Sequence, residues 1–199
     1  QRRLAAALGA GVAVNEASGN MIVDMGGGSA EAAVISLGGI VVSKSIRVSG
    51  NALDDAIALY LKKKYGLIIG EQTAEQLKIN FGRAAADQNS DQEKPVAVKG
   101  RDSIQGLPKS VAIKVEEIEA AMRPKLNQIV SMVKSVLEEV PPELSSDIID
   151  KGIVLTGGTA LLKNFDLLLT QETGVPCHVA EEPLLCVAKG TGIALENRH

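Results

Sequence analysis

The pattern of hydrophobic and polar positions divides the chain into strand-like and helix-like segments. An apolar run at 21–26 ends in glycines and predicts a buried strand, and two further β-favouring runs follow at 30–37 and 40–49. The pair Gly38-Gly39 between these runs predicts a two-residue hairpin turn. Residues 21–49 are therefore predicted to form a β-meander.

Helical spacing dominates the next part of the chain. It predicts one helix that begins after Asn51 and ends at Gly66, and a second helix over residues 71–86. A polar loop and two β-like segments are predicted at residues 87–94, 95–100 and 109–114.

A long amphipathic helix is predicted to begin near Val115, because apolar residues then recur every three or four positions as far as Val140. Pro124 lies inside this helix and predicts a bend, and Pro141-Pro142 ends it. The remaining residues predict a strand, a helix, a strand and a last helix, at 152–156, 159–173, 175–180 and from 183 onward.

This order of elements predicts an α/β lobe that is interrupted by a smaller insertion at about residues 50–118. A chain of 199 residues is long enough for one ordinary domain or two small lobes. Hydrophobic residues make up 45% of the chain but aromatic residues only 2%, so the core must consist of aliphatic side chains.

Charge and cysteine content narrow the function classes. A net charge of −3 without clustered Lys and Arg argues against a nucleic-acid partner. Cys177 and Cys186 lack metal-ligand spacing and fit a reducing cytoplasm. No apolar stretch approaches the roughly 18 residues of a membrane span. The chain begins with Gln1 and has no signal-peptide pattern, so we expect it to be a piece of a longer protein.

The first candidate site is the glycine turn between the first two predicted strands. Gly26, Gly27 and Gly28 can take positive φ and direct their N–H groups towards one point, which suits a phosphate. Asp24, two residues earlier, could hold Mg²⁺ directly or through water. From the residues alone, a hairpin turn that only needs flexible residues remains an alternative.

The second candidate site is LTGGT at 155–159, where a strand passes through Gly157 and Gly158 into a predicted helix. The N–H groups at a helix N-terminus form an anion site. A tight connection between strand and helix is the alternative.

The third candidate is the pair Glu75 and Lys78, which share one helix face at a spacing of three residues. A carboxylate can accept hydrogen bonds from ribose hydroxyls, and a lysine stem can cover an adenine face. An exposed ion pair is the alternative.

No catalytic residue is assigned. The chain has two histidines, His178 and the terminal His199, and neither forms a plausible Ser/His/Asp or Cys/His arrangement.

Together these elements resemble the actin, DnaK-type chaperone and sugar-kinase superfamily, and five segments in family order resemble the MreB family more closely. These segments are AAALGAG at 5–11, VDMGGGS at 23–29, GEQTAE at 70–75, PPELSSDI at 141–148 and LTGGTALL at 155–162. The similarity covers essentially the whole chain.

The resemblance implies an actin-like ATPase lobe of the ribonuclease H-like type. Subdomain IIA would comprise residues 1–49 and 119–199, and a smaller α+β subdomain IIB would comprise residues 50–118. Asp24 would act on Mg²⁺ or its water. ATP or ADP would be held by a second phosphate loop made of Gly26, Gly27, Gly28 and Ser29. Glu75 and Lys78 would contact the ribose and the adenine, and Gly157 and Gly158 would flank the nucleotide.

Four positions depart from the family pattern. Arg2 stands where the family has the acidic residue that positions the attacking water, and Arg3 replaces the following proline. Ala30 replaces a threonine, and Thr159 replaces the third glycine of LTGGG. The first phosphate loop and its lobe lie upstream of the matched segments. We therefore expect no ATP hydrolysis by this chain alone.

The resemblance implies a cytoskeletal protein whose ATP-dependent filaments determine cell shape and guide cell-wall synthesis. It would lie in the cytoplasm at the inner face of the cell membrane, with membrane association only through the absent N-terminal lobe. Its partners would be further copies of itself, head to tail, and other cell-shape and wall-synthesis proteins. The alternatives are a sugar-kinase-like phosphotransferase of the same superfamily and a nonhydrolytic scaffold that only binds partners.

Overall fold

The computed structural model describes residues 2–85 and 94–196, and the chain forms two compact units. Unit 1 comprises Gln1–Gly50, Gln128–Leu161 and Phe165–His199, and unit 2 comprises Asn51–Asn127 and Leu162–Asn164. The chain passes from unit 2 back to unit 1 between Asn127 and Gln128, inside the long helix α4 (Val115–Leu137). None of the described helices is both long and apolar enough to cross a membrane.

Unit 1 is built on a five-stranded sheet with the order β3-β2-β1-β7-β8. Its strands are β1 (Asn20–Met25), β2 (Ala30–Ser36), β3 (Gly39–Ile46), β7 (Ile153–Thr156) and β8 (Cys177–Val179). The first three form the predicted meander with antiparallel pairing, and β7 and β8 join β1 in parallel. This mixed sheet confirms the α/β class.

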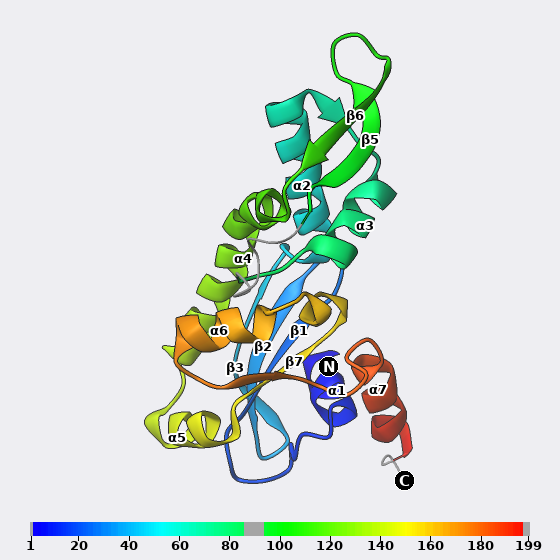
Figure 1. The fold of residues 1–199 in the computed structure, drawn as a ribbon. Helices are drawn as coiled ribbons and strands as arrows, with labels where there is room; N and C mark the ends of the chain where they lie inside the picture. The colour runs from blue at the N-terminus through cyan, green and yellow to red at the C-terminus, as the bar shows by residue number, and fades with distance from the viewer. Residues whose placement is uncertain (1, 86–93, 197–199) are drawn as a thin grey trace. The chain divides into compact units, whose positions relative to one another are not determined.

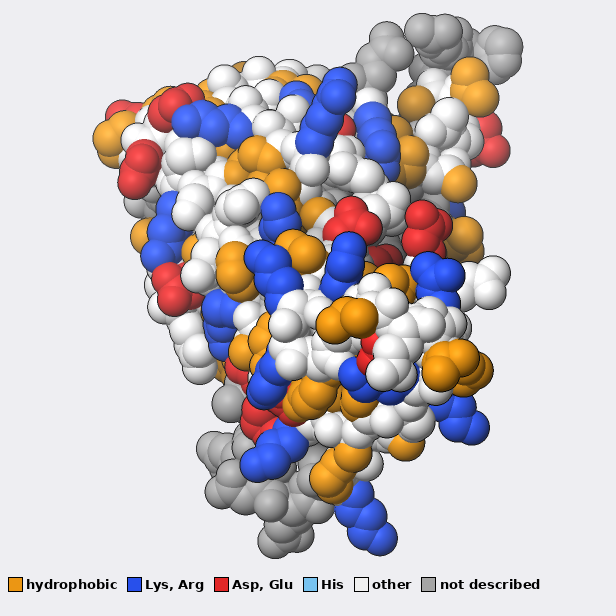
Figure 2. Space-filling model, turned by 90° about the horizontal axis from the view of Figure 1, so that it is seen from above, with side chains coloured by type: hydrophobic (Ala, Val, Ile, Leu, Met, Phe, Trp, Pro, Cys, Tyr) orange, Lys and Arg blue, Asp and Glu red, His pale blue; other side chains and the backbone are white. Residues whose placement is uncertain are grey.

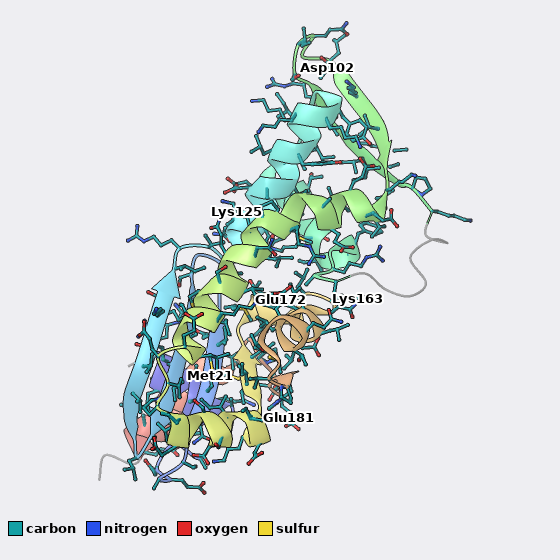
Figure 3. The ribbon with its side chains drawn as sticks, turned by 90° about the vertical axis from the view of Figure 1, so that its left-hand side faces the viewer. Met21, Asp102, Lys125, Lys163, Glu172 and Glu181 are labelled. Carbon is teal, nitrogen blue, oxygen red and sulfur yellow. The ribbon has the colours of Figure 1, made fainter. Side chains whose placement is uncertain are left out.

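Helices cover both faces of this sheet. Figures 1 and 3 show α5 (Pro142–Lys151), α6 (Phe165–Thr173) and the end of α4 on one face. The other face carries α1 (Arg2–Gly9) and α7 (Cys186–Glu196), which lie side by side in Figure 1.

Side chains that alternate along the strands fill the two layers of the core. Ala6 and Ala7 of α1 pack in one cluster with Ile22 of β1 and Ile35 of β2. Met21, which is labelled in Figure 3, is also buried but alternates to the opposite face of β1. Because Asp24 is two residues beyond Ile22, its side chain lies on the α1 face.

The described part of unit 2 contains two helices, a small antiparallel sheet and the start of α4. The helices are α2 (Gly50–Tyr65) and α3 (Glu71–Phe81), and the sheet has the order β4-β5-β6, with β4 (Leu67–Ile68), β5 (Val96–Asp102) and β6 (Pro108–Ile113). Asp102, labelled in Figure 3, ends β5 at the hairpin. The core is aliphatic, as the composition requires, with Leu53, Ile57, Leu61, Leu67, Ile113 and Ile118 fully buried.

Several element boundaries differ from the prediction for local reasons. The hairpin turn is Leu37-Gly38 rather than Gly38-Gly39, because Ser36 pairs with Gly39 and the two turn residues take φ values of 50° and 73°. The helix predicted to reach residue 86 ends at Phe81, where the Gly82 N–H caps the Lys78 carbonyl. Residue 86 and positions 87–93 of the predicted loop lie outside the described residues.

The helix predicted over 159–173 is divided in the structure. A 3-10 turn, η2 (Gly158–Leu161), precedes α6, and Asn164 with φ of 60° breaks the helix between them. The long helix ends at Leu137, before the predicted stop at Pro141-Pro142, and Pro142 begins α5, which the pattern did not predict. The short α1 and β4 were not predicted either.

Candidate functional site

The β1–β2 turn projects from the end of a buried strand. Met25 pairs with Ala30 as the last ladder pair, and the Gly26 N–H donates to the Ser29 carbonyl at 3.1 Å. Asp24 and Met25 are buried, whereas Gly27 and Gly28 are exposed. None of Gly26, Gly27 and Gly28 takes a left-handed φ, so the predicted reason for three glycines is wrong. At Gly28 the backbone is open, since a Cβ there would meet nothing within 4 Å.

The Gly26 carbonyl anchors this turn. It accepts hydrogen bonds from the Ser49 hydroxyl at 2.5 Å, the Thr159 hydroxyl at 3.0 Å and the Gly50 N–H at 3.3 Å. In a trans peptide the C=O and the next N–H point in opposite directions. The Gly27 N–H therefore points away from these three donors. This is the direction in which an N–H group must point to donate a hydrogen bond to a phosphate at the exposed turn.

The second candidate loop lies against the first. Gly157 has φ of +85°, and a Cβ there would come within 2.2 Å of the Met25 carbonyl oxygen, so the position requires glycine. Its N–H donates to the Pro183 carbonyl at 2.8 Å. The Thr159 hydroxyl, one residue after Gly158, bonds Gly26. The structure thus brings the two glycine motifs together, although the predicted helix N-terminus at residue 159 is only the η2 turn.

Asp24 is held in place by two side chains. Its Oδ1 accepts from the Thr156 hydroxyl at 3.1 Å, because Asp24 and Thr156 are paired residues of the parallel strands β1 and β7. Its Oδ2 accepts from Nε of Arg2 at 3.1 Å. The aspartate side chain is only 3% exposed, whereas that of Arg2 is 51% exposed.

The first turn of α1 brings a second arginine to the neighbouring strands. Arg3 donates to Glu31 of β2 and to the Ser43 hydroxyl of β3, both at 2.8 Å. Glu31 is the ladder partner of Asp24. Two adjacent carboxylates are therefore each paired with an arginine from α1.

The third candidate pair belongs to unit 2. Glu75 and Lys78 lie on α3, where Glu75 is exposed and Lys78 is half-buried. The Lys78 ammonium lies 2.9 Å from Oδ1 of Asp54 on α2. Burial raises the pKa of Asp54, against the lowering effect of Lys78. The roles of Glu75 and Lys78 towards ribose and adenine remain predictions.

Some participating residues were not predicted. Sequence reasoning selected the glycines of both loops but not the hydroxyls of Ser49 and Thr159, which hold the loops together. It noted Arg2 only as a departure from the family pattern, not as the ion-pair partner of Asp24.

The cysteines show no sign of a metal or nucleophile site. Cys177 and Cys186 are free thiols, and burial raises the pKa of Cys177 to about 11. Among the described residues, no group of three or more His, Cys, Asp or Glu side chains could hold a metal ion. On the face shown in Figure 2, Lys and Arg side chains are interspersed with Asp and Glu.

The fold and the joined glycine turns define a protein of the actin-like class. The structure of MreB5 of Spiroplasma citri bound to ADP matches with a TM-score of 0.93 and 38% identity, covering 99% of this chain and 59% of that chain. A MamK double helical filament, at 16% identity and a TM-score of 0.78, shares the fold.

The chain belongs to the MreB/Mbl family, whose model, described as MreB/Mbl protein, matches residues 1–199. It is 50% identical over 193 residues to the cell shape-determining protein MreB of Escherichia coli K12, covering 97% of this chain and 55% of that protein. It is 47% identical over 192 residues to the cell shape-determining protein Mbl of Bacillus subtilis, covering 96% and 57%. The chain therefore spans a little over half the length of these relatives.

Proposed function

We propose that this chain is the nucleotide-binding half of a bacterial actin-like cytoskeletal protein. The observation that carries the proposal is the exposed β1–β2 turn, whose Gly26 carbonyl is tied inward by Ser49 and Thr159 so that the Gly27 N–H points outward. Family membership supports it, and so do the two structures of Spiroplasma citri MreB5, one bound to ADP and one to AMPPNP.

Each candidate residue has a proposed role in binding ATP or ADP. Gly26, Gly27, Gly28 and Ser29 form the phosphate loop, and Gly157 and Gly158 flank the nucleotide. Glu75 accepts from the ribose, and the stem of Lys78 covers the adenine. In family terms, unit 1 corresponds to subdomain IIA and unit 2 to subdomain IIB.

The protein to which this chain corresponds forms ATP-dependent filaments that determine cell shape and guide cell-wall synthesis. This role follows from the MreB and Mbl relatives, which are named as cell shape-determining proteins. The proposal includes a location in the cytoplasm at the inner face of the membrane, with other cell-shape and wall-synthesis proteins as partners. For this chain alone we expect no ATP turnover above a control without protein, because Arg2 replaces the acid that would position the water.

Head-to-tail self-association is part of the proposal. The surface of subdomain IIA in one copy meets subdomain IIB of the next, and such a heterologous contact can repeat without closing into a ring. With only half of a relative's length available, we expect weak, reversible association that does not depend on nucleotide. Sedimentation over a concentration series, with and without ATP, measures it; a tight dimer or an ATP-dependent polymer would contradict it.

The binding proposal is tested with two matched variants at Gly28. This position has an ordinary φ and room for a side chain, so neither variant should disturb folding. Gly28→Asp puts a negative charge where the phosphate is proposed to lie, and Gly28→Asn adds the same volume without charge. We expect calorimetry to show that Asp weakens ADP binding at least about tenfold more than Asn, roughly 1.4 kcal/mol. Equal affinities of the two variants would remove the phosphate from this loop.

A further inference from the structure

Asp24 forms an ion pair with Arg2. Nε of Arg2 lies 3.1 Å from Oδ2 of Asp24, and the Thr156 hydroxyl lies 3.1 Å from Oδ1. Both carboxylate oxygens thus have a donor. The buried aspartate carries its negative charge against a guanidinium that is always protonated.

Arg2 also reaches the glycine turn. Its Nη2 lies 3.1 Å from the position that a Cβ would take at Gly26. With its side chain 51% exposed, the guanidinium extends from buried Asp24 to the rim of the β1–β2 turn. A guanidinium presents five donors in a planar fork that suits phosphate oxygens, so one edge can hold Asp24 while another faces an anion at the turn.

Asp24 does not fit the Mg²⁺ site that the family resemblance implies. Mg²⁺ requires octahedral oxygen ligands and is usually held by one or two carboxylates together with phosphate oxygens. At Asp24 a divalent ion would have to displace Arg2 from Oδ2 or bind beside its positive charge. The adjacent carboxylate, Glu31, is paired with Arg3 and offers no replacement. Nowhere among the described residues do three or more His, Cys, Asp or Glu side chains form a group that could hold a metal ion.

We infer that Arg2 replaces the divalent cation at this loop, so that the chain binds nucleotide phosphate free of metal. The guanidinium supplies the positive charge that Mg²⁺ would supply, and the Gly27 N–H supplies a neutral donor. The inference rests on the proposed function, because it assumes that the phosphate lies at the β1–β2 turn.

ADP calorimetry in excess magnesium chloride and in excess EDTA tests whether nucleotide binding is independent of Mg²⁺. For the wild-type chain we expect the two dissociation constants to agree within about twofold. Arg2→Ala should weaken binding in EDTA by about tenfold or more and make binding depend on Mg²⁺. Arg3→Ala is the control, since it removes the same charge one residue away and should leave binding independent of Mg²⁺. A wild-type chain that binds ADP tenfold more weakly in EDTA would overturn the inference.

Titration with Mn²⁺ in the absence of nucleotide tests whether Arg2 excludes a divalent ion from Asp24. Paramagnetic broadening of the backbone amides of residues 24–29 should be absent in the wild type and present in Arg2→Ala, and Asp24→Ala in the Arg2→Ala chain should remove it. Broadening in the wild type would overturn the inference. So would the absence of broadening in both, since Arg2 would then not be what excludes the ion. If ADP does not bind under any condition, the proposed function fails while this experiment still decides the role of Arg2.

Discussion

The Thr159 hydroxyl donates a hydrogen bond to the Gly26 carbonyl at 3.0 Å, which joins two glycine turns 133 residues apart in the chain. Thr159 is buried and replaces a glycine of the family pattern. Thr159→Val keeps the shape but removes the donor, so we expect the free energy of unfolding to fall by about 1 kcal/mol. Urea unfolding measures it, with Thr159→Ser as the control that keeps a hydroxyl. A Thr159→Val chain as stable as the wild type would mean that the bond contributes nothing.

Helices α1 and α7 cross at two glycines. A Cβ at Gly190 would lie 1.7 Å from the Ala5 carbonyl oxygen, whereas a Cβ at Gly192 would meet nothing within 4 Å. Gly190→Ala should force the helices apart and cost about 1–3 kcal/mol or more. Gly192→Ala, on the same helix, should be neutral or stabilising by up to about 1 kcal/mol, because alanine favours helix. Thermal unfolding of the pair tests the crossing, and equal melting temperatures would rule it out.

Leu155 lies on β7, between β1 and β8 in the unit 1 sheet, and is fully buried. Leu155→Ala should lower the free energy of unfolding by about 2–5 kcal/mol, through lost burial and the cavity that remains. Val154→Ala is the control on the same strand, because Val154 is only half-buried and should cost less. A loss below about 1 kcal/mol for Leu155→Ala would mean that the strand does not pack as described.

Glu117 joins the end of α2 to the start of α4 in unit 2. It accepts from the Tyr65 hydroxyl at 2.8 Å, the Tyr60 hydroxyl at 3.1 Å and the Lys64 ammonium. Burial raises the pKa of Glu117, but the hydrogen bonds from Lys64, the Lys114 N–H and the two tyrosines outweigh it and lower the pKa from 4.5 to about 2.

The pKa of Glu117 is lower in the folded chain than in the unfolded chain. Its contribution to the free energy of unfolding is therefore complete above pH 4.5 and is lost as the pH falls towards 2. After allowance for screening at half-exposed Lys64, we expect about 1–2 kcal/mol. Wild type should exceed Glu117→Gln in stability at about pH 7 and lose most of that advantage by about pH 3. Tyrosine fluorescence reports on this cluster, because the chain has two tyrosines and no tryptophan. An advantage that does not change with pH would contradict this.

The sequence predicted those parts of the fold that local pattern determines. Glycine-bounded apolar runs identified β1, β2 and β3, and helical spacing identified α2 and α4. It did not predict α5, because Pro141-Pro142 predicts the end of a helix, although proline at the first helical position also favours a new one. It missed α1 because Gly9 interrupts the apolar pattern, and that glycine is explained only by the contact with α7.

In the candidate site too, the sequence predicted what local pattern determines and missed what contacts between distant residues determine. The glycines at 26–28 and 157–158 stand out in the sequence as short runs, although only Gly157, with its left-handed φ and its contact with Met25, requires glycine in the structure. The hydroxyls of Ser49 and Thr159 were not, because their common acceptor, the Gly26 carbonyl, is distant from both in the chain. Likewise, nothing in the local pattern pairs Lys78 with Asp54.

ADP titration followed by backbone amide NMR is the most direct test that nucleotide phosphate binds at the β1–β2 turn. We predict that the largest shifts fall on Gly27, Gly28 and Ser29, with smaller ones at Gly158, while amides of the β5–β6 hairpin stay unchanged. Adenosine without phosphate should leave the Gly27 and Gly28 resonances in place. Shifts that avoid residues 26–29, or that adenosine reproduces there, would mean that the phosphate does not bind at this turn.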